Sequence, residues 1–238
     1  MAPGRRERLT RARVVDAAMT LADDGGLDGL SMRRLAEHLG VVPMALYRHV
    51  ADKHELLDAM IDRVFAELTD PVDPDWARAL RARAQSMRGA LTRHPWAIGR
   101  METGTPGPAN LAHHNAVMGC LRAGARLPFW DAVHASSLLD SYVYGFALQD
   151  RTLAGDIPAE AARRREVVVA DGPAALDAYP YLVEVADQLG RHGYDFAQEF
   201  EIGLDLVLDA IRGLRPVGET AVEGAGGPAS REPGPAGG

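Results

Sequence analysis

The sequence predicts an all-α protein in which a small three-helix domain at the N-terminus precedes a larger helical bundle. Apolar residues recur at helical spacing along most of the 238 residues, and no alternating pattern is long enough to indicate a strand. Clusters of glycine, proline and aspartate divide the helical stretches from one another. The hydrophobic fraction of 47% is sufficient for an ordinary soluble core.

The first two helices are short and have clear ends. Residues 14–22 place apolar side chains on one helical face, and Asp24-Gly25-Gly26 is expected to end that helix. The second helix is predicted to begin after Ser31, a typical N-cap residue, and to end at Gly40, which can adopt the left-handed conformation of a C-cap. Only a few residues therefore separate it from the next helix.

The third helix is very short and the fourth is longer. Pro43 suits a first helical turn, and Leu46 and Val50 share the inward face of the third helix. Asp52 can cap a fourth helix, whose apolar residues recur at helical spacing over 57–68. A helix as short as the third is not stable alone, so we expect it to pack against the second.

Residues 70–74 hold two prolines and are predicted to separate the fourth helix from the rest of the chain, which is also predicted to be mostly helical. Prolines and a glycine interrupt residues 154–180, where short helices with a mobile connection are expected. Residues 217–238 lack an apolar period and are expected to be disordered. Helices are expected at 76–91 (with Arg83 away from its apolar stripe), 111–124 (with Leu111, Met118 and Leu121 inward), 129–152 and 196–211.

Composition excludes several classes of protein. The net charge of −7 rules out a uniformly basic coat, yet residues 1–50 hold eight arginines against six acidic residues. A single cysteine, Cys120, excludes an internal disulfide and a cysteine-based zinc site. No secretory signal and no run near the roughly 18 apolar residues of a membrane span is present. We therefore expect a cytoplasmic protein with no contact to a membrane.

Residues 31–50 predict a helix-turn-helix, because a capped helix, a tight turn with glycine and a second short helix follow one another. In such a motif the second helix enters the major groove of DNA and the first crosses the backbone. Outward-facing donors of this segment are candidates for contact with phosphates and base edges, and its apolar groups can contact thymine methyls. The predicted DNA-binding residues are Ser31, Arg33, Pro43, Met44, Ala45, Tyr47, Arg48, His49 and Lys53.

The same segments resemble the tetracycline-repressor (TetR) family of transcriptional regulators. The N-terminal resemblance lies in residues 30–41 and 45–57, which hold a Leu-Tyr-x-His-Val-x-x-Lys-x-x-Leu-Leu pattern. Residues 90–96, 144–146 and 200–209 resemble the family's all-α C-terminal domain. The resemblance covers about residues 10–213 and implies a homodimer that binds a palindromic operator and releases it when a small molecule binds.

With the resemblance, the chain divides into four parts. We expect a disordered basic arm at 1–9, a helix-turn-helix DNA-binding domain at 10–55, an all-α effector-binding and dimerisation domain at 56–213, and a disordered tail at 214–238. The helices of 129–152 and 195–212 from two subunits are expected to form a four-helix bundle, as in the family. The predicted dimer interface comprises Phe200, Leu204, Val207 and Leu208, with Gly145 and Gly203 allowing close approach.

The effector is expected to bind within the C-terminal domain, among aromatic side chains and a few polar groups, above the helix that follows Lys53. The predicted pocket residues are Trp96, Met101, Glu102, Thr105, Asn115, Met118, Tyr142 and Tyr144. Glu102 stands where the founding tetracycline repressors have a histidine that ligates drug-bound Mg²⁺. A buried carboxylate there favours a cationic or metal-chelated effector, and no cofactor or metal site of the protein's own is expected.

Two other functions remain open at this stage. The chain could be a helical enzyme or ligand carrier in which residues 1–65 only pack, although no Gly-x-Ser-x-Gly motif or His-x-x-x-His spacing supports catalysis. It could also be an activator or a nucleoid-type DNA binder without an effector. We predict a ligand-responsive homodimeric repressor, and not an enzyme, with operator DNA and a small molecule as its partners.

Overall fold

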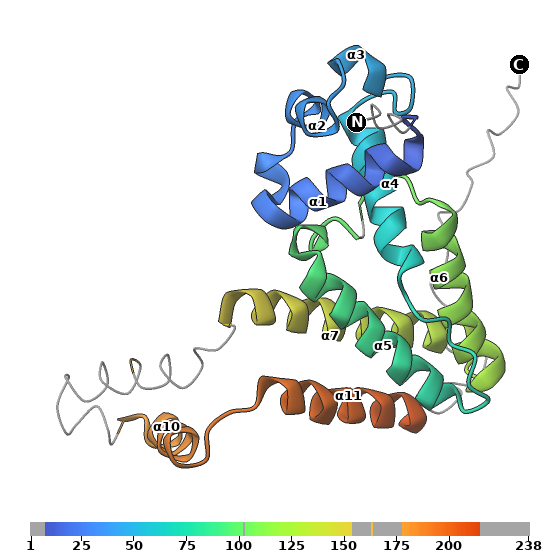
Figure 1. Cartoon of the computed structure of the whole chain (residues 1–238). Helices are drawn as coiled ribbons and strands as arrows, with labels where there is room; N and C mark the ends of the chain where they lie inside the picture. Colours follow the sequence, from blue (N-terminus) through green and yellow to red (C-terminus); the bar gives the residue numbers. More distant parts are fainter. Residues whose placement is uncertain (1–7, 102, 154–162, 164–177, 215–238) are drawn as a thin grey trace, which may run out of the picture.

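The computed structural model describes residues 8–101, 103–153, 163 and 178–214, and every regular element in these ranges is a helix (Figure 1). The predicted all-α class is confirmed. Glu102, nearly all of the predicted basic arm, most of 154–180 and the predicted tail at 217–238 lie outside the described residues.

The N-terminal part consists of α1 (Arg11–Gly29), α2 (Met32–Leu39), α3 (Pro43–Leu46) and the first half of α4 (Lys53–Ala66). The predicted end of the first helix is in part wrong, because α1 continues to Gly29. Gly26 nevertheless breaks its geometry with φ of +67°, a conformation that glycine adopts at little cost. The local prediction of a glycine break was therefore correct, although the chain resumes a helical turn after it.

Side chains close the N-terminus of each longer helix in this part. Thr10 Oγ1 accepts from Arg13 N at 3.2 Å at the start of α1, and the Asp52 carboxylate accepts from two backbone amides at the start of α4. These amide hydrogen bonds hold the pKa of Asp52 below its ordinary value. Each cap satisfies amides that have no partner within the helix, so it sets where the helix begins.

The larger part contains α5 (Trp76–Arg93), the 3₁₀ turn η1 (Pro95–Ala97), α6 (Pro108–Gly119), the π turn η2 (Cys120–Gly124), α7 (Phe129–Leu153), α10 (Pro180–His192) and α11 (Phe196–Gly213). The predicted inward face of the 111–124 helix is in part wrong. Leu111 is 58% exposed, whereas Asn110, His113 and Val117 are buried. Periodicity could not find this face, because two of the three inward side chains are polar.

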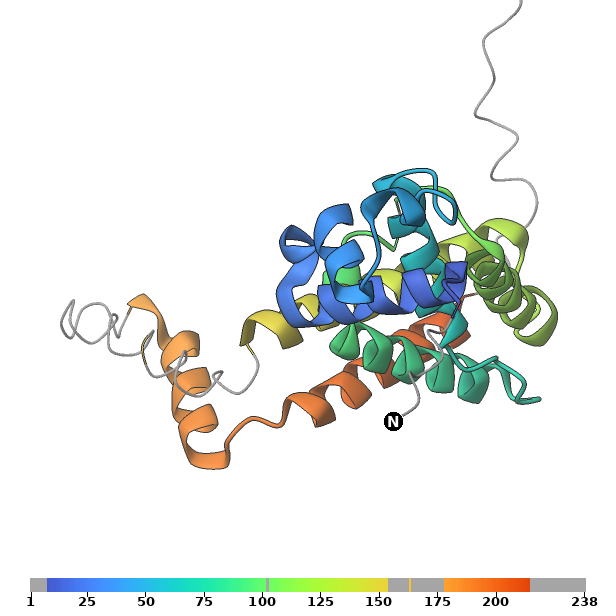
Figure 2. The ribbon, with the colours of Figure 1, turned by 45° about the horizontal axis from the view of Figure 1, so that its top comes forward.

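Helix α4 connects the two parts. Figure 1 shows it running from the α1–α3 unit down toward α6, and it packs against α1 at one end and α6 at the other. Helix α5 packs against α7 and α11 in the lower part of the molecule, while α10 lies apart from the other helices in both views (Figure 2). Helix α6 is therefore in direct contact with the helix that carries the N-terminal unit.

Helix α11 packs into the core of its own chain, which corrects the predicted dimer interface. Phe200, Leu204 and Leu208 are at most 1% exposed and face α5 and α7, so these three side chains are not available to a partner. The exposed apolar side chains of α11 are Ile202 and Leu206, at 46% and 67%. Phe200, Leu204 and Leu208 lie on one face of α11 because they are four residues apart. This apolar face, which the sequence analysis assigned to the dimer interface, packs in the core of the single chain.

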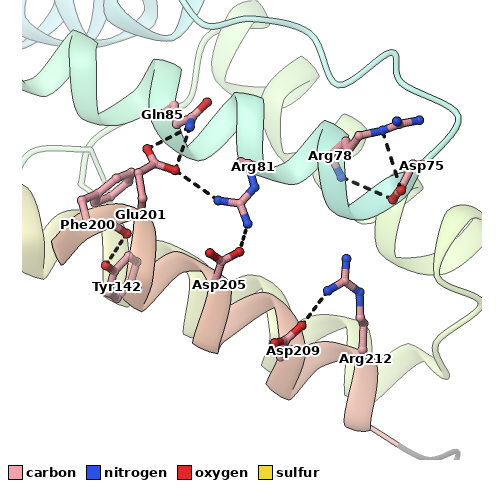
Figure 3. Close-up of polar contacts among 10 residues, drawn as sticks. All are labelled: Asp75, Arg78, Arg81, Gln85, Tyr142, Phe200, Glu201, Asp205, Asp209 and Arg212. Carbon is pink, nitrogen blue, oxygen red and sulfur yellow. Dashed lines mark hydrogen bonds and ion pairs between the residues drawn. The ribbon is translucent and has the colours of Figure 1, made fainter. Parts of the chain in front are cut away.

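Polar contacts on the neighbouring face hold α11 against α5, as Figure 3 shows. The Arg81 guanidinium donates to Glu201 Oε2 at 3.1 Å and also contacts Asp205, and Gln85 Nε2 donates to Glu201 Oε1 at 2.8 Å. Gly203 lies against the Tyr142 ring, where any side chain would overlap it. Close approach at Gly203 thus joins α7 and α11 of one chain, and not two subunits.

None of the described helices combines the length and the apolar character that crossing a lipid bilayer requires.

Candidate DNA-binding and effector sites

The helix-turn-helix is held together by short-range contacts. Ser31 Oγ accepts from Arg34 N at 3.2 Å at the start of α2, and Gly40 closes that helix in the left-handed conformation with φ of +65°. Leu46 and Val50, which are at most 1% exposed, then anchor the short α3 on the core below it. The sequence therefore fixes the direction of α3 through one cap, one glycine and two buried side chains.

The third helix is shorter than predicted, since α3 ends at Leu46 and Tyr47, Arg48 and His49 lie in the turn that follows it. The side chains predicted to contact DNA are divided between α3 and this turn. Met44 is 72% exposed and Tyr47 44%, and Arg48 is exposed without a hydrogen bond or ion pair to any described residue. Pro43 is also exposed, whereas Ala45 and His49 are half-buried. The thioether of Met44 on α3 is thus exposed close to the hydroxyl of Tyr47 and the guanidinium of Arg48 in the turn after it.

Three predicted DNA-binding residues also have roles within the protein. Ser31 caps α2, Arg33 Nε donates to Glu37 at 2.9 Å on the exposed face of α2, and Lys53 Nζ donates to the carbonyl of Leu30 at 2.8 Å. The Lys53 bond ties the start of α4 to the start of α2. We infer that Lys53 orients the motif, whereas the exposed Arg33 can exchange Glu37 for a phosphate.

A first cavity, of about 190 Å³, lies between α4, the 103–107 loop and α6. Its lining includes Met101 and Thr105, two of the predicted effector residues, and α4, the helix that begins at Lys53, forms one wall through Asp58, Ile61 and Asp62. His114 of α6 also lines it. The cavity therefore lies where the helix that carries the N-terminal unit meets the loop before α6.

Two carboxylates of α4 accept hydrogen bonds from backbone amides of that loop and of the first turn of α6, and we call this pair of contacts the clasp. Asp58 Oδ2 accepts from Thr105 N at 3.2 Å, and Asp62 Oδ1 accepts from Asn110 N at 2.9 Å. The second bond caps α6 from another helix, since the N-cap residue of α6, Gly107, has no side chain to do so. Any rearrangement of the loop must break these bonds or carry α4 with it.

Gly104 is expected to be essential to this clasp. Its φ of +92° is unfavourable for any other residue, and a Cβ there would overlap Asp58 Oδ1. We expect Gly104→Ala to lower the free energy of unfolding by about 1–3 kcal/mol, measured by chemical denaturation. Gly99→Ala is the matched control, because Gly99 has φ of +83° but nothing within 4 Å of a Cβ. Equal losses in the two variants would contradict the Asp58 contact.

A second cavity, of about 430 Å³, lies between α6 and α7. Met118 and Tyr144, both predicted effector residues, line it together with three serines, Asp140 and Val133 of α7. His114 lines both cavities, so the two adjoin at this side chain. The predicted pocket residues Met101, Thr105, Met118 and Tyr144 are thereby brought around one part of the fold.

Three other predicted pocket residues lie elsewhere. The Trp96 indole donates to Asp23 Oδ1 at 2.6 Å and faces α1, and the Tyr142 hydroxyl donates to the carbonyl of Phe200 at 2.8 Å between α7 and α11. Burial raises the pKa of Tyr142 to about 12. Asn115 is exposed and lines neither cavity. Trp96 and Tyr142 thus join helices through hydrogen bonds and line neither of these two cavities.

Sequence reasoning missed a buried polar pair beside the second cavity. Arg83, which was expected on the polar side of α5, is 3% exposed, and its Nε donates to Nδ1 of His113, which is 4% exposed, at 2.6 Å. Arg83 Nη1 also donates to the carbonyl of Thr69 at 2.6 Å. Burial and the Arg83 charge lower the pKa of His113 to about 3, so the imidazole is neutral.

The low pKa of His113 has a consequence for stability. In the unfolded chain this histidine takes up a proton near pH 6.5, whereas in the folded chain it stays neutral down to about pH 3. Stability is therefore lost as the pH falls below 6.5. We expect His113 to contribute a decrease of about 2 kcal/mol in the free energy of unfolding between pH 7 and 5. His113→Phe should flatten that dependence in urea titrations, and an unchanged slope would contradict burial of the imidazole.

A second polar cluster joins α1 to the C-terminal ends of α4 and α5. His94 contacts Asp23 Oδ1 through Nδ1 at 2.8 Å and Glu67 Oε1 through Nε2 at 3.1 Å, and Arg93 donates to Glu67 at 2.7 Å. Burial raises the pKa of Glu67, but the bonds from Arg93 and His94 outweigh it and lower the pKa overall. With the Trp96 bond to Asp23, this cluster fixes α1 on the larger part.

Two family models match this chain, one over its N-terminal part and one over its larger C-terminal part. The family model described as bacterial regulatory proteins of the tetR family matches residues 14–60. The model described as the tetracyclin repressor-like C-terminal domain matches residues 69–215, more than half of the chain. The chain belongs to the TetR family. Its relatives are named as transcriptional repressors, and the tetR family model covers the whole helix-turn-helix segment of this chain.

Curated TetR-family relatives align along most of the chain. The repressor DrrR1 of Streptomyces coeruleorubidus is 34% identical over 222 residues, which are 89% of this chain and 80% of the relative. The class A tetracycline repressor of transposon 1721 from Escherichia coli is 33% identical over 86% of this chain and 91% of its own length. The TetR-family regulator ActR of Streptomyces coelicolor, solved with actinorhodin, has a TM-score of 0.73 at 30% identity and covers 87% and 98% of the two chains.

Proposed function

We propose that this TetR-family regulator is a homodimeric repressor that binds a palindromic operator and leaves it when a small molecule enters the C-terminal part. The observation that carries the proposal is the exposed face of α3. Met44 on α3, and Tyr47 and Arg48 in the turn after it, are exposed, while Leu46 and Val50 are buried beneath them. An unpaired guanidinium and a hydroxyl are donors for phosphate and base edges, and Met44 is suited to a thymine methyl.

The dimer is proposed to form through α7 and α11. The face of α11 opposite its buried stripe carries Ile202 and Leu206, and α7 exposes Leu138 and Leu148, at 45% and 52%. Exposed leucines on adjacent long helices are typical of a helical interface. The proposed interface uses the same two helices as the predicted one but another face of α11. Of the four predicted interface residues, Val207 is half-buried and can lie at the edge of the proposed interface.

The effector is proposed to bind in the adjoining cavities around His114. The relative ActR, solved in complex with actinorhodin, supports a small molecule as the effector. A molecule there would contact the 103–107 loop, which Asp58 and Asp62 link to α4. Displacement of α4 would change the orientation of α1–α3 and hence the distance between the two recognition helices of a dimer. The molecule acts only in so far as it binds the displaced form more tightly.

The test is a gel-shift titration of the full chain on the DNA upstream of its own gene, followed by addition of candidate small molecules, with transcription from that DNA measured in parallel. We expect a complex on this DNA, lower transcription, and release by at least one compound. A complex that raises transcription would indicate an activator, and the absence of any complex would contradict DNA binding.

A further inference from the structure

The start of α3 exposes two large apolar side chains. Val42 and Met44 are 68% and 72% exposed, and neither belongs to the hydrophobic core or to the partly buried apolar residues packed against it. Val42 occupies the N-cap position of α3, where its side chain makes no capping hydrogen bond. Within the part of the chain that the structure describes, these two side chains therefore contribute neither to packing nor to capping.

The neighbouring helices show what an N-cap residue does elsewhere in this unit. Thr10, Ser31 and Asp52 stand at the N-caps of α1, α2 and α4, and each accepts a hydrogen bond from a backbone amide of its helix. A serine or aspartate at position 42 would supply the same bond to the short α3, whereas valine cannot. Val42 thus lacks this local stabilisation and presents its methyl groups to the solvent, as a surface that a binding partner can cover.

The chemistry of this segment narrows what the partner offers. No side chain from Val41 to Leu46 can donate a hydrogen bond, and donors begin with the Tyr47 hydroxyl and the Arg48 guanidinium in the turn after α3. In a helix-turn-helix, the N-terminal residues of the second helix contact base edges in the major groove. Of the four bases, only thymine presents a methyl group there, so thymine is the base that apolar side chains at this point can distinguish.

We propose that each operator half-site holds thymine at the positions facing the start of α3, and that Val42 and Met44 distinguish it by contact with its C5-methyl group. The inference rests on the proposed function, since it takes α3 as the recognition helix, and it specifies which base the operator carries there. Discrimination between sequences is then divided within the motif. The start of α3 reads methyl groups, and Tyr47 and Arg48 bind hydrogen-bonding atoms of the DNA.

The test compares two versions of the DNA upstream of the gene that differ only in the methyl groups of their thymines. One is synthesised with thymidine and the other with deoxyuridine, which keeps every hydrogen-bonding atom of the base and lacks the C5-methyl group. Fluorescence anisotropy at one fixed salt concentration gives the affinity of the full-length protein for each DNA. Burial of one methyl group changes affinity about 4-fold, so one methyl in each of two half-sites should make uracil DNA bind about 15-fold more weakly.

A double variant assigns this difference to the two apolar side chains. Val42→Ala combined with Met44→Ala removes most of the apolar contact, so this variant should bind thymine and uracil DNA with nearly equal affinity. Val72→Ala is the matched control, because Val72 is 85% exposed and lies outside the helix-turn-helix, and it should keep the full difference. Circular dichroism verifies the fold, and should the double variant fail to fold, the comparison of the two DNAs with the unmodified protein still decides.

The outcomes separate this inference from the proposed function. A complex of the unmodified protein that forms with equal affinity on the two DNAs would overturn the inference alone. A preference for thymine DNA that persists in the double variant would also overturn it, because the preference would then come from another contact or from the stiffness of the DNA. Absence of a complex with either DNA would contradict DNA binding itself, and with it both proposals.

Discussion

Arg48→Ala and Tyr47→Ala should each abolish tight operator binding while leaving the protein folded. Both side chains are exposed, so their loss leaves the core below α3 intact. A good contact to a base edge contributes about 1–3 kcal/mol, so we expect affinity to fall about 10-fold to 100-fold for each variant. Fluorescence anisotropy with the upstream DNA at one fixed salt concentration measures the effect, and circular dichroism verifies the fold.

Arg78→Ala provides the control for charge, because this arginine is 69% exposed on α5 and lies outside the helix-turn-helix. It should bind the operator with unchanged affinity. The affinity of the unmodified protein for the operator should also fall steeply as the salt concentration rises. The net charge of −7 gives no overall attraction to DNA, so binding depends on individual contacts between arginines and phosphates, which salt weakens. If the Arg48 and Tyr47 variants bind the operator as tightly as the unmodified protein, the assignment of α3 as the recognition helix is wrong.

Leu206→Glu should convert the protein to monomers and, in the same step, abolish binding to the palindrome. Leu206 is 67% exposed in the single chain, so a charge there costs the monomer little, but it would be buried without a partner in an α11–α11 contact. Sedimentation gives the assembly state and anisotropy the affinity. The two losses should appear together, because one half-site supplies only part of the contacts.

Leu111→Glu is the matched control for that change. Leu111 is a leucine of similar exposure, 58%, on α6, and its replacement should leave both dimer and operator binding intact. If the Leu206→Glu variant still forms dimers, the face of α11 that carries Leu206 is not the dimer interface. A clean monomer that still binds the palindrome tightly would contradict the dimeric mechanism.

The local features of the fold were readable from the sequence. Ser31, Gly40, Pro43 and Asp52 act through neighbours within a few residues, so both ends of α2 and the starts of α3 and α4 follow from residue type alone. The length of the third helix was not readable, because α3 ends at Leu46 and Val50 is buried from the segment that follows it. The candidate DNA-binding surface was nevertheless the most predictable part of the molecule.

Contacts between distant segments were not readable. An apolar stripe such as Phe200–Leu204–Leu208 looks the same whether it fills its own core or a partner's surface. Arg83 and His113 are 30 residues apart, and an arginine in a helix is ordinarily solvated, so nothing in the sequence indicates that burial joins them. Trp96 and Tyr142 illustrate the same limit, because residue type does not indicate their hydrogen bonds to Asp23 and to the carbonyl of Phe200.

A hydroxyl-radical footprint of the full-length protein on the DNA upstream of its gene tests the central claim most directly. A homodimer with one α3 in each of two successive major grooves predicts two protected segments, related by two-fold symmetry and centred about 10 base pairs apart. Protection of a single segment, or uniform protection that does not depend on sequence, would contradict a dimer that reads a palindrome through α3.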